Sequence, residues 1–365
     1  MKRYLSLDIL RGLTVAFMII VNNPGSWSCM YPILRHASWN GCTPCDLVFP
    51  FFLFCVGVSM VFAFAKYQGL TAAVVKKVMK RGVLLYLVGV LLTAFPFYPT
   101  NPDPEMSFWQ NWIHWLQHLR LMGVLPRIAL CYVVGSILVL WLQTPKKLLA
   151  AAGILCVLHV ALLLIFAGPE GAFTLEGNFA RRLDLAILGD NHIYHGYGLP
   201  FEPEGFLGTL TGTATVLLGY FIGTAVRTTT PMEASPKVFS YSAALLLGGL
   251  ALSLVVPLNK PLWSASYVLY TAGWASFVFA LLIYLVDVKG YEKPFMPFRA
   301  LGMNALALFV LSGLLMKILW IYTSWDFTTI FGRTELLSLC HALLYLTLLL
   351  IIAVILFRRK IFIKL

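Results

Sequence analysis

Ten apolar runs of roughly 17 to 25 residues constrain the fold of this chain more than any other feature. A helix needs about 20 mostly apolar residues to cross the hydrocarbon core of a bilayer. The chain has 365 residues, of which 12% are charged, whereas soluble domains carry roughly 25% charged residues. We therefore predict an all-α membrane protein, a polytopic bundle of about ten transmembrane helices. The runs are 5–21, 47–65, 79–95, 121–142, 147–167, 205–226, 237–257, 262–286, 299–320 and 336–357.

Lysine and arginine are distributed unequally between the loops that join these runs. Of the 27 such residues, 18 lie in the terminal segments and in the loops on the same side. Cytoplasmic loops carry an excess of Lys and Arg, so both termini are predicted to be cytoplasmic. The six on the outer side are Arg35, Arg120, Arg181, Arg182, Lys260 and Arg333.

The composition also limits domains and partners. No internal repeat, low-complexity segment or soluble accessory domain is evident, so 1–365 is predicted to be a single transmembrane domain. The net charge of +12 indicates topology and not nucleic-acid binding, because no basic patch is interleaved with aromatic residues. We expect membrane lipid as a partner, and the sequence leaves a homodimer open.

The densest group of polar residues precedes the second run, where water would meet the bilayer. It includes Asn22, Asn23, His36 and Asp46. A neutral imidazole is the usual general base for an amine or hydroxyl proton, and a carboxylate can orient it. On spacing alone, however, His36 and Trp39 are better explained as anchors at headgroup depth.

Cys42 and Cys45 form a CxxC pair in the same loop, with Cys29 nearby. On an oxidising outer face this pattern favours a disulfide that staples the loop. Zinc held by His36, Cys42 and Cys45 is the alternative. No second CxxC or HxxH completes a four-ligand site, so we predict no metal.

Two further features suggest ligand binding. Arg127 falls inside an apolar run without a local partner, so it must face the bundle interior, where a phosphate or pyrophosphate is a suitable counter-ion. The loop 168–204 combines acids, amides and aromatics that suit a sugar, although an ordinary solvated loop has the same composition.

A series of motifs extends over almost the whole chain. They are LDILRG at 7–12, VNN at 21–23, RHASWNG at 35–41, DLVFPFFLFCVG at 46–57, GVLPRIALCY at 123–132, LGDNHIY at 188–194, EPEGFLGT at 202–209, NKPLWSASYVLYT at 259–271, DVKG at 287–290 and GMN at 302–304. In this order they resemble the heparan-alpha-glucosaminide N-acetyltransferase family of transmembrane acyltransferases, and its bacterial members in particular. The most specific are HASWNG and the DLVFP that follows it.

The resemblance implies a transferase that takes an acetyl group from cytosolic acetyl-CoA and delivers it to the amine of a glucosamine-type sugar outside the membrane, here a bacterial inner membrane. It places the active-site histidine on His36 and a functional asparagine on Asn22 or Asn23, and we assign Asp46 to orient the imidazole. The residues assigned to the CoA donor are Arg127, Lys289, Arg299, Asn304 and Ser266. The resemblance thus implies a small-molecule or glycan acceptor as a partner, and the residues assigned to it are Trp39, Asn40, Asp190, His192 and Glu204.

A permease for amino sugars or other small molecules is the alternative function. A bundle of about ten spans with buried charges also suits a transporter. We find no inverted repeat and no pair of Gly/Pro-broken helices in matching halves of the sequence. The motifs therefore favour the transferase.

Overall fold

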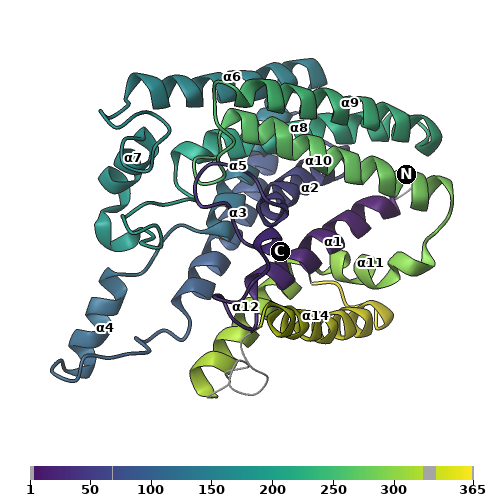
Figure 1. Cartoon of the computed structure of the whole chain (residues 1–365). Helices are drawn as coiled ribbons and strands as arrows, with labels where there is room; N and C mark the ends of the chain where they lie inside the picture. The colour runs from purple at the N-terminus through teal and green to yellow at the C-terminus, as the bar shows by residue number, and fades with distance from the viewer. Residues whose placement is uncertain (1–3, 68, 324–333, 364–365) are drawn as a thin grey trace.

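The computed structural model describes residues 4–67, 69–323 and 334–363, and its regular elements are all helical. The α-helices are α1 (Leu5–Asn22), α2 (Val48–Ala63), α3 (Ala72–Ala94), α4 (Phe108–Gln117), α5 (Val124–Leu142), α6 (Pro145–Ile165), α7 (Phe179–Leu188), α8 (Leu207–Arg227), α9 (Pro231–Ser253), α10 (Ala265–Leu282), α11 (Met296–Met303), α12 (Ala305–Tyr322) and α14 (Glu335–Arg358). Short helices are η1 (Pro32–Leu34), η2 (Pro44–Leu47), η3 (Asp190–His192), η4 (Ile283–Val288) and η5 (Lys293–Phe295). Figure 1 shows their arrangement.

The predicted membrane bundle is confirmed, with ten as an approximate number of spans. Eight of the described helical segments are long and apolar enough to cross a membrane: α1, η2 with α2, α5, α6, α8, α10 with η4, α12 and α14. The other two predicted runs correspond to α3 and α9, which have 23 residues each but carry charged residues near their N-termini. The basic residues Lys2, Arg3, Arg333 and Lys364 lie outside the described residues.

Small residues let the central helices approach each other closely, as is usual in membrane bundles. A Cβ added to Gly57 of α2 would lie 1.9 Å from the carbonyl oxygen of Val216 on α8. A Cβ added to Gly219 of α8 would lie 2.2 Å from the carbonyl oxygen of Phe54 on α2. Any larger side chain at these two positions would therefore push α2 and α8 apart.

Loops that are distant in the sequence meet at one end of the bundle, which we call the His36 end. There Trp39 Nε1 donates to the carbonyl oxygen of Phe173 at 2.7 Å, and Asn259 Nδ2 donates to Asn40 Oδ1 at 3.1 Å. The opposite end is fastened by the backbone N–H of Leu5, which donates to Asp287 Oδ1 at 3.1 Å. Predicted outer loops thus meet at one end.

Three features of the fold were not predicted. Helices α4 and α7 occupy two of the predicted outer loops, and Ser107 and Asn178 cap their N-termini. Figure 1 shows α4 standing apart from the bundle. The run predicted at 299–320 is divided at Asn304 into α11 and α12. Asn304 leaves the helical conformation, and its side chain binds the backbone of Ile361 and Ile363.

Candidate active site

His36 and Asp46 come together at the His36 end, ten residues apart in one loop. Pro44 begins the short helix η2, which carries Asp46 toward the extended segment after η1. His36 Nδ1 lies 2.7 Å from Asp46 Oδ1. Because an ionised carboxylate only accepts, the proton of this hydrogen bond belongs to Nδ1, and Nε2 is left as an acceptor. Half of the His36 side chain is exposed, at 50%, so substrates can reach the imidazole.

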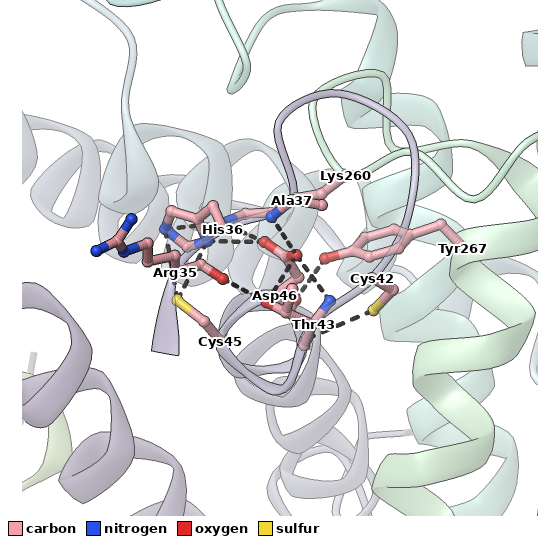
Figure 2. Close-up of polar contacts among 9 residues, drawn as sticks. All are labelled: Arg35, His36, Ala37, Cys42, Thr43, Cys45, Asp46, Lys260 and Tyr267. Carbon is pink, nitrogen blue, oxygen red and sulfur yellow. Dashed lines mark hydrogen bonds and ion pairs between the residues drawn. The ribbon is translucent and has the colours of Figure 1, made fainter. Parts of the chain in front are cut away.

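Asp46 is held by several donors although its side chain is only 1% exposed. Oδ2 accepts from the backbone N–H groups of Ala37 at 3.1 Å and Thr43 at 3.0 Å. The Thr43 hydroxyl donates to the carbonyl oxygen of Arg35 at 2.7 Å and ties the two sides of the loop together. The carboxylate is thus fixed in the orientation that the imidazole requires, as Figure 2 shows.

Lys260, from the loop before α10, completes this group. Its Nζ lies 3.4 Å from Asp46 Oδ1 and 3.3 Å from His36 Nε2. It also lies 2.9 Å from Nδ1, a contact between two donors and not a hydrogen bond. An ammonium group at this place supplies a positive charge beside the proposed base.

The same group includes Cys45 and Tyr267. Cys45 Sγ lies 3.2 Å from His36 Nδ1, on the side away from Cys42. The Tyr267 hydroxyl donates to the carbonyl oxygen of Asp46 at 2.5 Å and fastens η2 to α10. The hydrogen bond to Tyr267 therefore couples the orientation of Asp46 to α10.

The disulfide expected from the CxxC pattern is absent, because all seven cysteines are free thiols. The turn of η2 directs Cys45 toward His36, whereas Cys42 Sγ contacts the carbonyl oxygen of Thr43. Burial, followed by the charge of Asp46, raises the pKa of Cys42 to about 12, so its thiol is unreactive at neutral pH. Within the described part of the chain, no three His, Cys, Asp or Glu side chains are arranged to hold a metal.

Trp39 and Asn40 extend the site toward the other outer loops. Trp39 packs edge-on against Tyr197 and Phe201, with ring centroids 5.9 and 5.3 Å away. Asn259 is fully buried and donates to both the carbonyl oxygen of Trp39 and Asn40 Oδ1. These contacts fix the position of the HASWNG motif relative to the chain before α10.

The remaining acceptor candidates lie on the same end but not beside His36. Glu204 pairs with Arg120 Nη2 at 2.6 Å, and Arg120 also forms a two-point ion pair with buried Glu202. His192 Nδ1 contacts the carbonyl oxygen of Leu119 at 2.7 Å. Asp190 is exposed and contacts His195 at 3.3 Å. Their roles in acceptor binding stay predictions.

The two asparagines are separate from the hydrogen-bonded group around His36. Asn22 is exposed at the end of α1. Asn23 is buried, and its Nδ2 donates to the carbonyl oxygen of Ile19 at 2.8 Å. The structure therefore gives neither residue a contact with His36, and their catalytic role remains a prediction.

The five donor candidates are divided between the two ends of the bundle. Ser266 begins α10 at the His36 end, where its hydroxyl donates to the carbonyl oxygen of Pro257 at 3.0 Å. Lys289 follows η4, about 34 Å farther along the same helix at 1.5 Å per residue. It is exposed over the Tyr284 ring. Arg299 pairs with Glu292 at 3.8 Å, and Asn304 binds the backbone near Ile361.

Arg127 faces the bundle interior, as predicted, and is only 1% exposed. Its Nη2 donates to the carbonyl oxygen of Gly205 at 2.8 Å, and its guanidinium lies over the Trp263 ring at 5.2 Å. Asp184 Oδ1 accepts from the N–H of Phe206, the other side of the same peptide group, at 2.8 Å. Arg127 and Asp184 therefore hold one peptide at the start of α8.

Comparisons with known proteins agree with the family predicted from the sequence motifs. The family model described as heparan-alpha-glucosaminide N-acetyltransferase, catalytic, matches residues 3–256. This chain belongs to the heparan-alpha-glucosaminide N-acetyltransferase family. The family predicted from the motifs is thereby confirmed, and the matched region contains His36 and Asp46.

Two curated relatives carry the name heparan-alpha-glucosaminide N-acetyltransferase. The Mus musculus protein is 28% identical over 85% of this chain and 53% of its own length. The Homo sapiens protein is 27% identical over 84% of this chain and 52% of its own length. The chain thus spans about half the length of the curated relatives it matches.

Sequence reasoning missed several members of the candidate site, notably Lys260, Asn259 and Tyr267. All three lie in the NKPLWSASYVLYT motif, more than 200 residues after His36. One signal was present for Lys260, because it is the only lysine in the loops predicted to be outside. Lysine is rare on that side of a membrane protein, so its presence there pointed to a specific role.

Proposed function

We propose that this chain transfers an acetyl group from acetyl-CoA to the amine of a glucosamine-type sugar, with His36 as the general base. The observation that carries the proposal is the 2.7 Å hydrogen bond between half-exposed His36 and buried Asp46. A base oriented by a fixed carboxylate is what proton removal from an amine requires. Membership of the family favours this function over a permease.

The proposed reaction is a direct acyl transfer. Acetyl-CoA supplies the thioester, and His36 Nε2 takes the proton as the amine nitrogen forms a bond to the carbonyl carbon. The bond from carbon to sulfur then breaks, and the leaving thiolate receives the proton from the imidazolium. Asp46 stabilises the imidazolium, and the Lys260 ammonium, 3.3 Å from Nε2, stabilises the negative charge that develops on the carbonyl oxygen.

We place the His36 end outside and both chain termini in the cytoplasm of a bacterial inner membrane. The threefold excess of Lys and Arg in the terminal segments and in the loops on the same side supports this orientation. Donor and acceptor then approach from opposite sides. Right-side-out vesicles loaded with acetyl-CoA are expected to acetylate external glucosamine, while externally added acetyl-CoA gives no product.

The substitution His36→Ala tests the proposed base. Transfer to glucosamine is expected to fall about 10²–10⁴-fold, the usual contribution of a positioned base, while acetyl-CoA binding is retained. Rapid-quench mass spectrometry of the wild type distinguishes direct transfer, which gives no acetylated protein, from an acyl-histidine intermediate. Wild-type transfer by the folded variant would remove His36 from the mechanism.

A further inference from the structure

An apolar groove of about 290 Å³ lies between α1, α2 and α10. All three helices belong to membrane-spanning segments, so the groove lies within the bilayer. Several of its side chains, among them Phe17, Phe51 and Trp274, are half-buried, so the groove is open to the surroundings. Its occupant must therefore be able to enter from lipid.

The lining of the groove selects for a hydrocarbon chain. Among its lining residues, polar side-chain atoms are limited to the Thr14 hydroxyl and the Trp274 indole N–H. The Thr14 hydroxyl already donates to the carbonyl oxygen of Leu10 at 2.8 Å. The pantetheine arm of CoA carries two amides and a hydroxyl, which would lose their hydrogen bonds to water here without replacement. The groove thus fits an alkyl chain far better than the donor.

The groove reaches the short helix that carries a residue of the candidate active site. Pro44 and Leu47, at one end of the groove, belong to η2, the same short helix that carries Asp46. The other end reaches Leu10, in the N-terminal half of α1. A lipid whose headgroup lies at His36 would therefore extend its chain along this groove toward the centre of the bilayer.

A cationic side chain close in the chain to this end of the groove complements an anionic linker. Arg35 is exposed, and its backbone is tied to Thr43, the residue before Pro44. Its guanidinium donates to the carbonyl oxygen of Ser28 at 3.0 Å and has no acidic partner in the described ranges. Figure 2 shows the guanidinium turned away from Asp46. A phosphate between chain and sugar would supply the missing counter-charge.

We propose that the acceptor is a glycolipid in which an amino sugar is joined to a hydrocarbon chain through a phosphate, with the chain in this groove. This inference rests on the proposed function, because it names the acceptor of that reaction. The amine reaches His36, the phosphate lies at Arg35, and the chain lies between α1, α2 and α10.

The test compares two acceptors with purified protein in lipid nanodiscs. One is glucosamine 1-phosphate, and the other is its decyl phosphodiester. We expect kcat/KM for the decyl compound to be higher by about tenfold or more. Each methylene that leaves water raises the affinity by up to ~fourfold. The net gain is smaller than the sum over the chain, because the surrounding lipid competes for it. Val278→Trp and Leu13→Phe fill the groove and are expected to abolish this ratio.

Leu247→Trp is the matched control, because Leu247 is 68% exposed on α9, away from the groove. It is expected to keep the wild-type ratio. Thermal unfolding of each variant shows whether it is folded. A ratio that survives both groove substitutions would overturn the inference, because the preference would then come from partition into the bilayer. A raised KM for acetyl-CoA with both acceptors would also overturn it, since the groove would then hold the donor.

A second measurement does not depend on transfer. The decyl phosphodiester of glucosamine 1-phosphate, carrying a diazirine at the end of its decyl chain, is expected to label peptides of α1 and α10. Val278→Trp should prevent the labelling. Acetyl transfer without this labelling would overturn the glycolipid inference and leave the proposed function intact. Labelling in a protein that acetylates no amine would instead overturn the proposed function and support the groove as a glycolipid site.

Discussion

Two buried carboxylates at the His36 end, Asp46 and Asp184, are held in different ways. Asp46 is 1% exposed, and both of its oxygens accept hydrogen bonds, with Lys260 3.4 Å away. Asp184 is fully buried, and only Oδ1 has a partner, the N–H of Phe206. No partner for its Oδ2 is found among the described residues. Burial raises the pKa of Asp184 to about 7.

The two carboxylates differ in their surroundings: those of Asp46 suit the orientation of the proposed base, whereas those of Asp184 suit a role in fixing the backbone. Donors around Asp46 compensate for burial and aim one oxygen at His36. Asp184 has one neutral donor, and it shares a peptide group with Arg127 at the start of α8. The same substitution, Asp to Asn, is thus expected to affect catalysis at one site and stability at the other.

Asp46→Asn is expected to have the largest effect. An amide at this position lets the imidazole adopt the wrong tautomer, and transfer to glucosamine should fall about 10³–10⁴-fold, the loss typical where an aspartate orients a catalytic histidine. Steady-state kinetics measures the loss. Asp184→Asn is the control, and its activity should stay within about twofold of the wild type. Equal losses in both variants would contradict the distinction between the two carboxylates.

Lys260→Met sharpens the same comparison, because it removes the cation beside Asp46. If the ammonium stabilises charge only in the transition state, kcat should fall about 10²-fold with little change in KM, and Lys260→Arg should restore part of it. Arg182→Met is the control, since it removes an exposed charge from the same end. A change confined to KM would assign Lys260 to acceptor binding and not to the transition state.

Asp184→Asn is expected to have the smallest effect, visible as a pH dependence. A carboxyl with a pKa near 7 when folded and 3.8 when unfolded stabilises the fold fully below about pH 4. This contribution is lost as the pH rises to about 7, at up to ~1.4 kcal/mol per pH unit. The Tm of the wild type should therefore fall from pH 5 to pH 7 relative to the variant. Parallel curves would show that Asp184 does not titrate in this range.

The sequence predicted the spans well because a bilayer requires helices of about 20 apolar residues, which are visible in any single chain. Helices α4 and α7 were missed because each has ten residues and lacks this length signal. The break at Asn304 depends on contacts with Ile361 and Ile363, more than 50 residues later. Such contacts have no local signature in the sequence.

The site was predictable where it is local. His36 and Asp46 lie in one loop, and the complementary chemistry of an imidazole and a carboxylate was enough to predict their pairing from the sequence. Lys260 joins them only through tertiary packing, across 224 positions. The disulfide predicted from the CxxC spacing was wrong. Cys42 and Cys45 are suitably spaced for a disulfide, but the turn of η2 directs Cys45 toward His36.

The hydrogen bond between Asn40 and Asn259 joins residues 219 positions apart. A ribosome releases the first two spans into the membrane long before it reaches Asn259, since chains are made from the N-terminus onward. The Asn40–Asn259 contact of the loop that carries His36 therefore cannot form until seven more α-helices, α3 to α9, have been synthesised. Assembly of this site is accordingly a late event in biogenesis, and a chain whose synthesis stops before residue 259 keeps His36 and Asp46 but lacks both Lys260 and the Asn259 contacts to their loop.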